Sequence, residues 1–137
     1  MIEFNYETDF ELTNESKLSN WVSEIITQND FKVGEINYIF CDDEYLHKLN
    51  LEFLNHDTLT DIISFDNTIG KLISGDIFIS VERVKENAPD FNVSFDEELH
   101  RVMIHGVLHY MGYKDKAVEE KDMMRKAENQ ALIKLKT

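Results

Sequence analysis

The sequence holds one cysteine, one proline and few basic residues, and each shortage excludes a kind of protein. A single thiol, Cys41, allows no intramolecular disulfide and no zinc site built from several cysteines. Any metal would therefore be held by histidines and carboxylates. The 14 Lys and Arg face 27 Asp and Glu, a net charge of -13. This charge disfavours contact with nucleic acid except through a local basic surface.

Long apolar runs are also lacking. The first ten residues, MIEFNYETDF, carry acidic groups and no apolar run, which does not resemble a signal peptide. No stretch approaches the roughly 18 apolar residues that a membrane span needs. These features favour a soluble, cytoplasmic protein that does not enter a membrane. Since 42% of the 137 residues are hydrophobic and no repeat or linker interrupts them, residues 1–137 are expected to form a single domain.

Alternating apolar residues predict strands at residues 2–6 and 33–40. Two further apolar runs, 60–65 and 76–81, flank a turn-like segment and predict a pair of strands. Helical spacing predicts a helix around residues 18–26 and a short helix capped by Asp42.

Three more helices are expected in the second half of the chain. A short one begins near Val81 and should stop before Pro89. Ser94 and Glu97 form a capping-box pattern for a helix that runs to about Met111, and the last helix spans about 117–135. The order of elements predicts an α+β fold, with a single mixed β-sheet of about four strands packed with about five helices.

The most informative stretch is HGVLHYMGYKD, from His105 to Asp115. Two histidines four positions apart on a helix are rotated by only about 40° and lie about one turn apart, so both imidazoles can bind one ion. Gly112 can end the helix and turn the chain back, which brings Asp115 round as a third ligand. Three protein ligands suit zinc and leave one position for water or substrate, as in catalytic sites. A histidine pair alone also occurs on ordinary helices, but Gly112 and Asp115 favour the metal interpretation.

The helix is zincin-like, yet it lacks one feature of zinc proteases. The H-E-x-x-H motif places a glutamate directly after the first histidine as the general base. Here that position is Gly106. A metallopeptidase is therefore the weaker alternative.

The sequence resembles the YbeY family of ribosomal RNA maturation factors. His105–His109 followed by Gly112-Tyr113 is similar to the family's H-G-x-L-H-x-x-G-Y signature. Residues 60–65, TDIISF, resemble its T-D-V-L-S-F segment, and residues 75–77 resemble its G-D-I segment. Leu49-Asn50 also fits, so the resemblance covers about residues 36–125.

The resemblance implies a single-strand-specific, metal-dependent endoribonuclease that acts in maturation of ribosomal RNA, at the 3′ end of the small-subunit rRNA, and in ribosome quality control. It implies one zinc ion held by His105, His109 and the residue at position 115. The implied partners are single-stranded or ribosomal RNA, the small ribosomal subunit and assembly proteins.

Two positions depart from the family pattern. The family usually has a third histidine where this chain has Asp115, and aspartate can ligate zinc through oxygen. The family also commonly carries an arginine where this chain has Leu54, and an arginine there would bind phosphate. The missing arginine leaves open a second alternative, a non-catalytic assembly factor that keeps its metal for stability.

The remaining candidates are residues that would surround the metal. Cleft residues beside the ligands are expected at Thr60, Asp61, Ser64 and Asp76, although strand ends often hold such residues for turns and capping. Basic residues after the metal motif are expected either to bind RNA or to form a solvated helix face: Lys114, Lys116, Lys121, Arg125 and Lys126.

Overall fold

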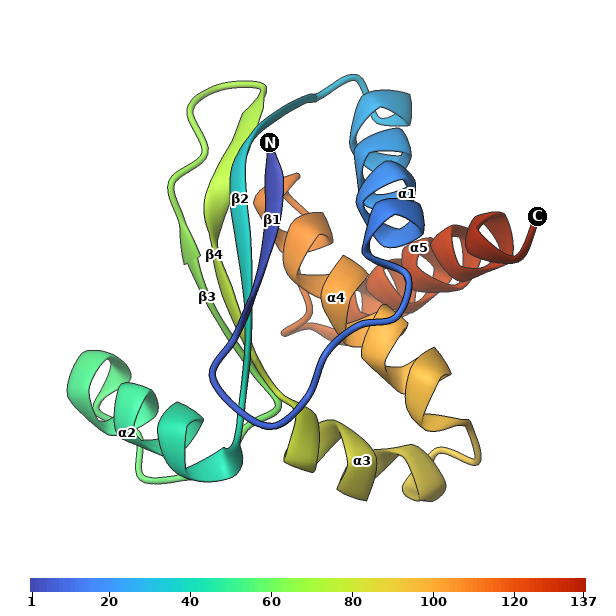
Figure 1. The fold of residues 1–137 in the computed structure, drawn as a ribbon. Helices are drawn as coiled ribbons and strands as arrows, with labels where there is room; N and C mark the ends of the chain where they lie inside the picture. Colours follow the sequence, from blue (N-terminus) through green and yellow to red (C-terminus); the bar gives the residue numbers. More distant parts are fainter.

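A computed structural model describes all 137 residues as four strands and five helices (Figure 1). In chain order these are β1 (Ile2–Tyr6), α1 (Glu15–Gln28), β2 (Lys32–Cys41), α2 (Asp43–Leu54), β3 (Ile62–Asp66), β4 (Leu72–Ser80), α3 (Val81–Asp90), α4 (Phe95–Tyr110) and α5 (Val118–Lys136). The predicted α+β architecture is confirmed. None of the five helices combines the length and the apolar composition needed to cross a bilayer.

The strands form one mixed sheet in the order β1-β2-β4-β3. β1 and β4 both run parallel to β2, whereas β3 pairs antiparallel with β4. The predicted pairing of the two apolar runs is therefore confirmed. β4 begins at Leu72, earlier than expected, because Lys32 of β2 already pairs with Leu72.

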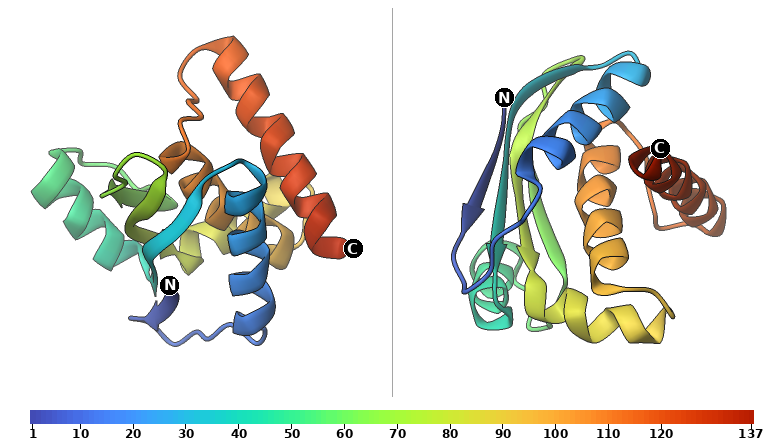
Figure 2. Two further views of the ribbon diagram at one scale, coloured as in Figure 1. Left: turned by 90° about the horizontal axis from the view of Figure 1, so that it is seen from above. Right: turned by 45° about the vertical axis from the view of Figure 1, so that its right-hand side comes forward.

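The helices lie on both sides of the sheet (Figures 1 and 2). α4 lies between the sheet and α5, so one face of α4 is buried against β4 and the opposite side meets α5. α2 lies on the other side of the sheet, where Phe53 meets Phe65 edge-on and Tyr45 stacks on Phe78. Packing between the sheet and α5 therefore fixes the position of α4, the helix that carries both histidines.

Local sequence signals set the ends of α4. Ser94 caps its start by accepting a 3.1 Å hydrogen bond from the backbone N–H of Glu97. After its last turn, Gly112 adopts φ +101°, a left-handed conformation that glycine takes without strain. The chain therefore leaves α4 sharply and returns toward it.

The prediction that α3 stops before Pro89 is wrong, since α3 continues through Pro89 to Asp90. Proline lacks the N–H that would bond to the carbonyl four residues earlier, but the loss in the last turn of a short helix is limited. The end of the helix is satisfied otherwise: Phe91 and Val93 donate to the Ala88 carbonyl and Asn92 donates to that of Pro89.

Candidate metal centre

Three potential ligand atoms converge beside α4. Nε2 of His105 and Nε2 of His109 are 3.0 Å apart, and Oδ2 of Asp115 lies 3.2 Å from each. His105 and His109 come from successive turns of α4, and Asp115 comes from the loop that follows Gly112. The structure thus brings together all three residues predicted as metal ligands, in a group that could hold a metal ion.

The triangle has the size that a zinc site requires. Zinc bonds to histidine nitrogen and carboxylate oxygen at about 2.0–2.2 Å, so neighbouring ligands of a tetrahedral site lie roughly 3.3 Å apart. The observed separations of 3.0 and 3.2 Å are close to this value. Only three protein atoms converge, which leaves one coordination position free, as in catalytic rather than structural sites.

Hydrogen bonds on the far side of each imidazole set the direction of its lone pair. His105 Nδ1 lies 2.7 Å from Oε2 of Glu128, and His109 Nδ1 lies 3.0 Å from the backbone oxygen of Tyr113. Both oxygens are acceptors, so each Nδ1 carries the proton and each Nε2 presents a lone pair. Two lone pairs and a carboxylate facing one point repel one another unless a cation lies between them.

Glu128 was not found by sequence analysis, although it is the carboxylate that orients His105. It lies on α5, is 5% exposed, and its other oxygen accepts a 3.0 Å hydrogen bond from Arg101. Burial raises the pKa of Glu128, but the hydrogen bonds from His105 and Arg101 outweigh it and hold that pKa below its usual range. A signal was present, because Glu128 falls on the face of the last helix that Met124 and Ala131 bury.

Glu128 and Asp115 also act on the charge state of His105. Burial lowers the pKa of His105, but the hydrogen bond and charge of Glu128, together with the charge of Asp115, raise it overall. A positive charge at this point is therefore favoured, whether it is a proton or a metal ion.

Asp61 is the predicted cleft residue that the structure places beside His105. It lines a cavity of about 260 Å³ together with His105, Arg101, Arg125 and Glu98. Burial raises the pKa of Asp61, and the hydrogen bonds to backbone N–H groups and the charge of His105 only partly offset this. A carboxyl in such surroundings holds a proton more readily than one in water.

The other predicted cleft residues lie apart from this cavity. The Thr60 hydroxyl donates to the Ile62 carbonyl at 3.3 Å, which stabilises the start of β3. Ser64 contacts the Tyr110 hydroxyl. Asp76 accepts a 3.0 Å hydrogen bond from Asn37 and points to the sheet face opposite α4, since neighbouring strand residues face opposite ways. The structure therefore does not bring Asp76 to the metal centre.

Basic residues surround the centre only in part. Lys114 and Lys116 line a cavity of about 460 Å³ with His109, Asp115 and Glu120. Arg125 lines the cavity on the His105 side, half-exposed and 3.8 Å from Glu128. Lys126 instead pairs with Asp122 at 3.1 Å, and Lys121 lines neither cavity.

The structure also shows where two residues lie that differ from related motifs: Leu54, in place of the family's arginine, and Gly106, in place of the glutamate of zinc proteases. Leu54, where the family's arginine would stand, ends α2, is 43% exposed and lines neither cavity. Gly106 faces the sheet: a Cβ there would lie 3.1 Å from Ile77 and 3.2 Å from Ile62. A glutamate at position 106 would therefore be driven into the core, so α4 has no place for the base of a zinc protease.

The structure combines a mixed sheet, a covering helix with two histidines and an aspartate in the next loop, a group that could hold a metal ion as in metal-dependent hydrolases. Comparison with known proteins is more specific. The model of the family described as Endoribonuclease YbeY matches residues 3–136. The chain belongs to the YbeY family of endoribonucleases, as its motifs predicted.

Individual proteins of known sequence also match this chain over nearly its whole length. A protein from Flavobacterium johnsoniae named Endoribonuclease YbeY is 63% identical over 132 residues, which cover 96% of this chain and 95% of the relative. One of the same name from Flavobacterium psychrophilum is 60% identical, covering 96% and 94%. A solution structure of a Thermotoga maritima protein superimposes with a TM-score of 0.72 at 28% identity, covering 98% of this chain and 89% of that one.

Proposed function

We propose that this chain is a zinc-dependent endoribonuclease that cleaves single-stranded RNA in the cytoplasm, in maturation of the small-subunit rRNA 3′ end and in ribosome quality control. The observation that carries the proposal is the triangle of His105, His109 and Asp115 atoms, 3.0 to 3.2 Å apart with one side open. The relatives' shared name supplies the substrate class. Partners on the small subunit follow from the family resemblance.

The ligands would be His105, His109 and Asp115, and zinc bound there supplies a Lewis acid that polarises a phosphate oxygen and activates water. Glu128 and the Tyr113 carbonyl keep the protons on the two Nδ1 atoms, so both Nε2 lone pairs stay directed at one point. Of the four predicted cleft residues, Asp61 is the one that we propose acts on the substrate. Its carboxyl, beside His105, would take a proton from the attacking oxygen or return one to the leaving oxygen.

The charge of the chain constrains where RNA can bind. With a net charge of -13, attraction for a polyanion has to be local. Lys114 and Lys116 line the cavity that contains His109 and Asp115, and Arg125 lines the cavity that contains His105, where Arg101 is already paired with Glu128. We propose that Lys114, Lys116 and Arg125 take over the phosphate contacts that the family's arginine would make at position 54.

Elemental analysis of the purified protein is the first test, beside His105→Ala and Asp115→Ala. Near-stoichiometric zinc in the wild type and loss in both variants support the three-ligand centre. Zinc that persists in Asp115→Ala would move the third ligand elsewhere. A wild type that holds no metal after zinc is supplied would refute the catalytic-metal proposal.

A cleavage assay then distinguishes a nuclease from a non-catalytic assembly factor. The second alternative stays open because the family's arginine is missing at position 54. Single-stranded and duplex RNA of one sequence are incubated with wild type and His109→Ala. We expect the wild type alone to cleave, and to prefer the single strand. If highly purified zinc-loaded protein cleaves no better than His109→Ala, a binding role becomes the better account.

A further inference from the structure

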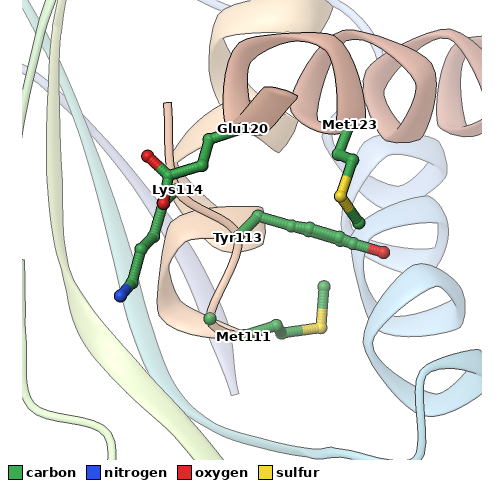
Figure 3. A pocket seen from close by; sticks show the side chains of 6 residues that line it. Met111, Tyr113, Lys114, Glu120 and Met123 are labelled. Carbon is green, nitrogen blue, oxygen red and sulfur yellow. The ribbon is translucent and has the colours of Figure 1, made fainter. Parts of the chain in front are cut away.

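A cavity of about 330 Å³ lies beside the loop that carries the third ligand. It is lined by Met111, Gly112, Tyr113, Lys114, Glu120 and Met123 (Figure 3). The Tyr113 ring extends between the side chain of Met111, from the end of α4, and that of Met123, from α5. Met123 is 65% exposed, so the apolar wall is open to solvent.

This cavity neighbours the cavity that contains His109 and Asp115. The backbone oxygen of Tyr113 is the group that accepts the Nδ1 proton of His109 at 3.0 Å. Lys114 and Glu120 line both this cavity and the one that contains His109 and Asp115. A molecule seated against Tyr113 therefore lies on the Nδ1 side of His109, across the loop from the side where the three proposed ligand atoms converge.

The polar groups at the rim differ in their availability. One carboxylate oxygen of Glu120 accepts a 2.9 Å hydrogen bond from the Ala117 N–H and so holds the start of α5. Lys114 is exposed and makes no ion pair in the structure. An apolar aromatic wall, with a free lysine that lines both cavities, suits a flat ring joined to an anion.

We propose that this cavity, the Tyr113 cavity, receives one nucleobase of a single-stranded RNA, adjacent to the phosphate bound at the metal centre, while Lys114 contacts the intervening phosphate. The inference rests on the proposed nuclease function and extends it to a base subsite. Stacking on an aromatic ring tolerates all four bases, because every base has a π-face. Thioether side chains at Met111 and Met123 reshape easily, which adds to this tolerance.

A base subsite would also account for the proposed preference for single strands. In a duplex the base is paired and stacked, and it has to be flipped out before it can enter a protein cavity. A splayed single strand enters without that cost. The Tyr113 cavity therefore penalises duplex RNA without any contact to its second strand.

The test measures binding rather than turnover. Zinc-loaded protein is titrated into a fluorescein-labelled 2′-O-methyl single strand of about 12 nucleotides, followed by anisotropy. The variants are Tyr113→Leu and Met123→Glu. The matched controls are Met123→Leu, which keeps the apolar wall, and Ile133→Glu, which adds the same charge on the same helix at a side chain 64% exposed, against 65% for Met123.

We expect Tyr113→Leu and Met123→Glu to raise the dissociation constant by about 5- to 100-fold, the range of one lost stacking contact. Met123→Leu should stay near the wild type, and Ile133→Glu should change it less than 3-fold by our estimate of one screened surface charge. An abasic nucleotide at one position should weaken binding to wild type but not further weaken binding to Met123→Glu.

Two results would overturn the inference. Equal losses in Met123→Glu and Ile133→Glu would show a general charge effect, and abasic strands that bind as well as intact ones would show that no base is held. Failure of the nuclease proposal gives a different pattern. Wild-type protein would then not hydrolyse bis(p-nitrophenyl) phosphate, a phosphodiester without any base, whether or not it binds the intact strand.

Discussion

Replacing Glu128 with glutamine tests whether a carboxylate remote from the metal sets the affinity of the centre. Glu128 receives two hydrogen bonds, from His105 Nδ1 at 2.7 Å and from Arg101 at 3.0 Å, so both neighbours need an acceptor. A glutamine amide offers an acceptor on one side and a donor on the other. If its oxygen serves Arg101, its NH₂ group faces His105 and favours the tautomer with the proton on Nε2, which cannot bind metal.

Two magnitudes follow from these contacts. Loss of a hydrogen-bonding partner behind a metal-binding histidine typically weakens metal affinity by about 10- to 100-fold. Breaking a buried ion pair from one side costs about 3–5 kcal/mol. Arg101 is 13% exposed and borders a cavity of about 260 Å³ that admits water, so we expect roughly 2–3 kcal/mol for the metal-free protein.

Competition with a zinc chelator gives the affinity, and urea unfolding of the metal-free protein gives the stability. Glu119→Gln is the matched control, because it removes the same charge from an exposed position of α5. That variant should match the wild type in both assays. A Glu128→Gln protein that binds zinc within 2-fold of the wild type would refute the assignment of Glu128 as the residue that orients His105.

Substitutions at three other positions test the third proposed ligand, the packing of α4 on the sheet and the ion pair between Asp43 and Arg83. Asp115→His should keep stoichiometric zinc by elemental analysis, because imidazole is an equivalent ligand, whereas Asp115→Asn should lose most of it. Gly106→Ala should destabilise the protein by about 1–3 kcal/mol in thermal or urea unfolding, because its Cβ would lie 3.1 Å from Ile77; an unchanged midpoint would contradict this packing. Asp43→Asn should cost roughly 1 kcal/mol at pH 7. The hydrogen bond from Arg83 holds the pKa of Asp43 below its usual range, so this stability is present above about pH 4 and is lost as the pH falls through the folded-state pKa, where the variant and the wild type should converge.

The grouping of the three candidate ligands could be predicted from sequence because it is local. His105, His109 and Asp115 lie within one short stretch, and helix geometry with a glycine turn suffices to bring them together. The sheet was predictable for a similar reason, since alternation along each strand reports which side chains are buried. The exact pairing partners, such as Lys32 beside Leu72, depend on contacts between distant segments.

What could not be predicted depends on packing between elements. Glu128 meets His105 only because α5 packs on α4. The sequence of either helix alone does not show which of its residues will lie opposite which residues of the other. Asp76 sits in a segment similar to the family's G-D-I motif, yet the side of the sheet that it faces is set by which neighbours are buried, here Ile77. Pro89 shows the converse case. The local rule that a helix stops before proline fails here, because hydrogen bonds to the carbonyls at the end of α3 stabilise its last turn.

The contact between Glu128 and His105 has a consequence for the order in which the protein matures. All three proposed ligands precede α5 in the chain, so they emerge from the ribosome before the carboxylate that fixes His105. Docking of α5 is secured elsewhere as well, where the indole N–H of Trp21 donates to the Ala131 carbonyl at 2.8 Å. A nascent chain would therefore hold a metal ion at the proposed centre only weakly until α5 folds back onto α4, so the proposed RNA-cleaving activity would be delayed until these two helices have packed together.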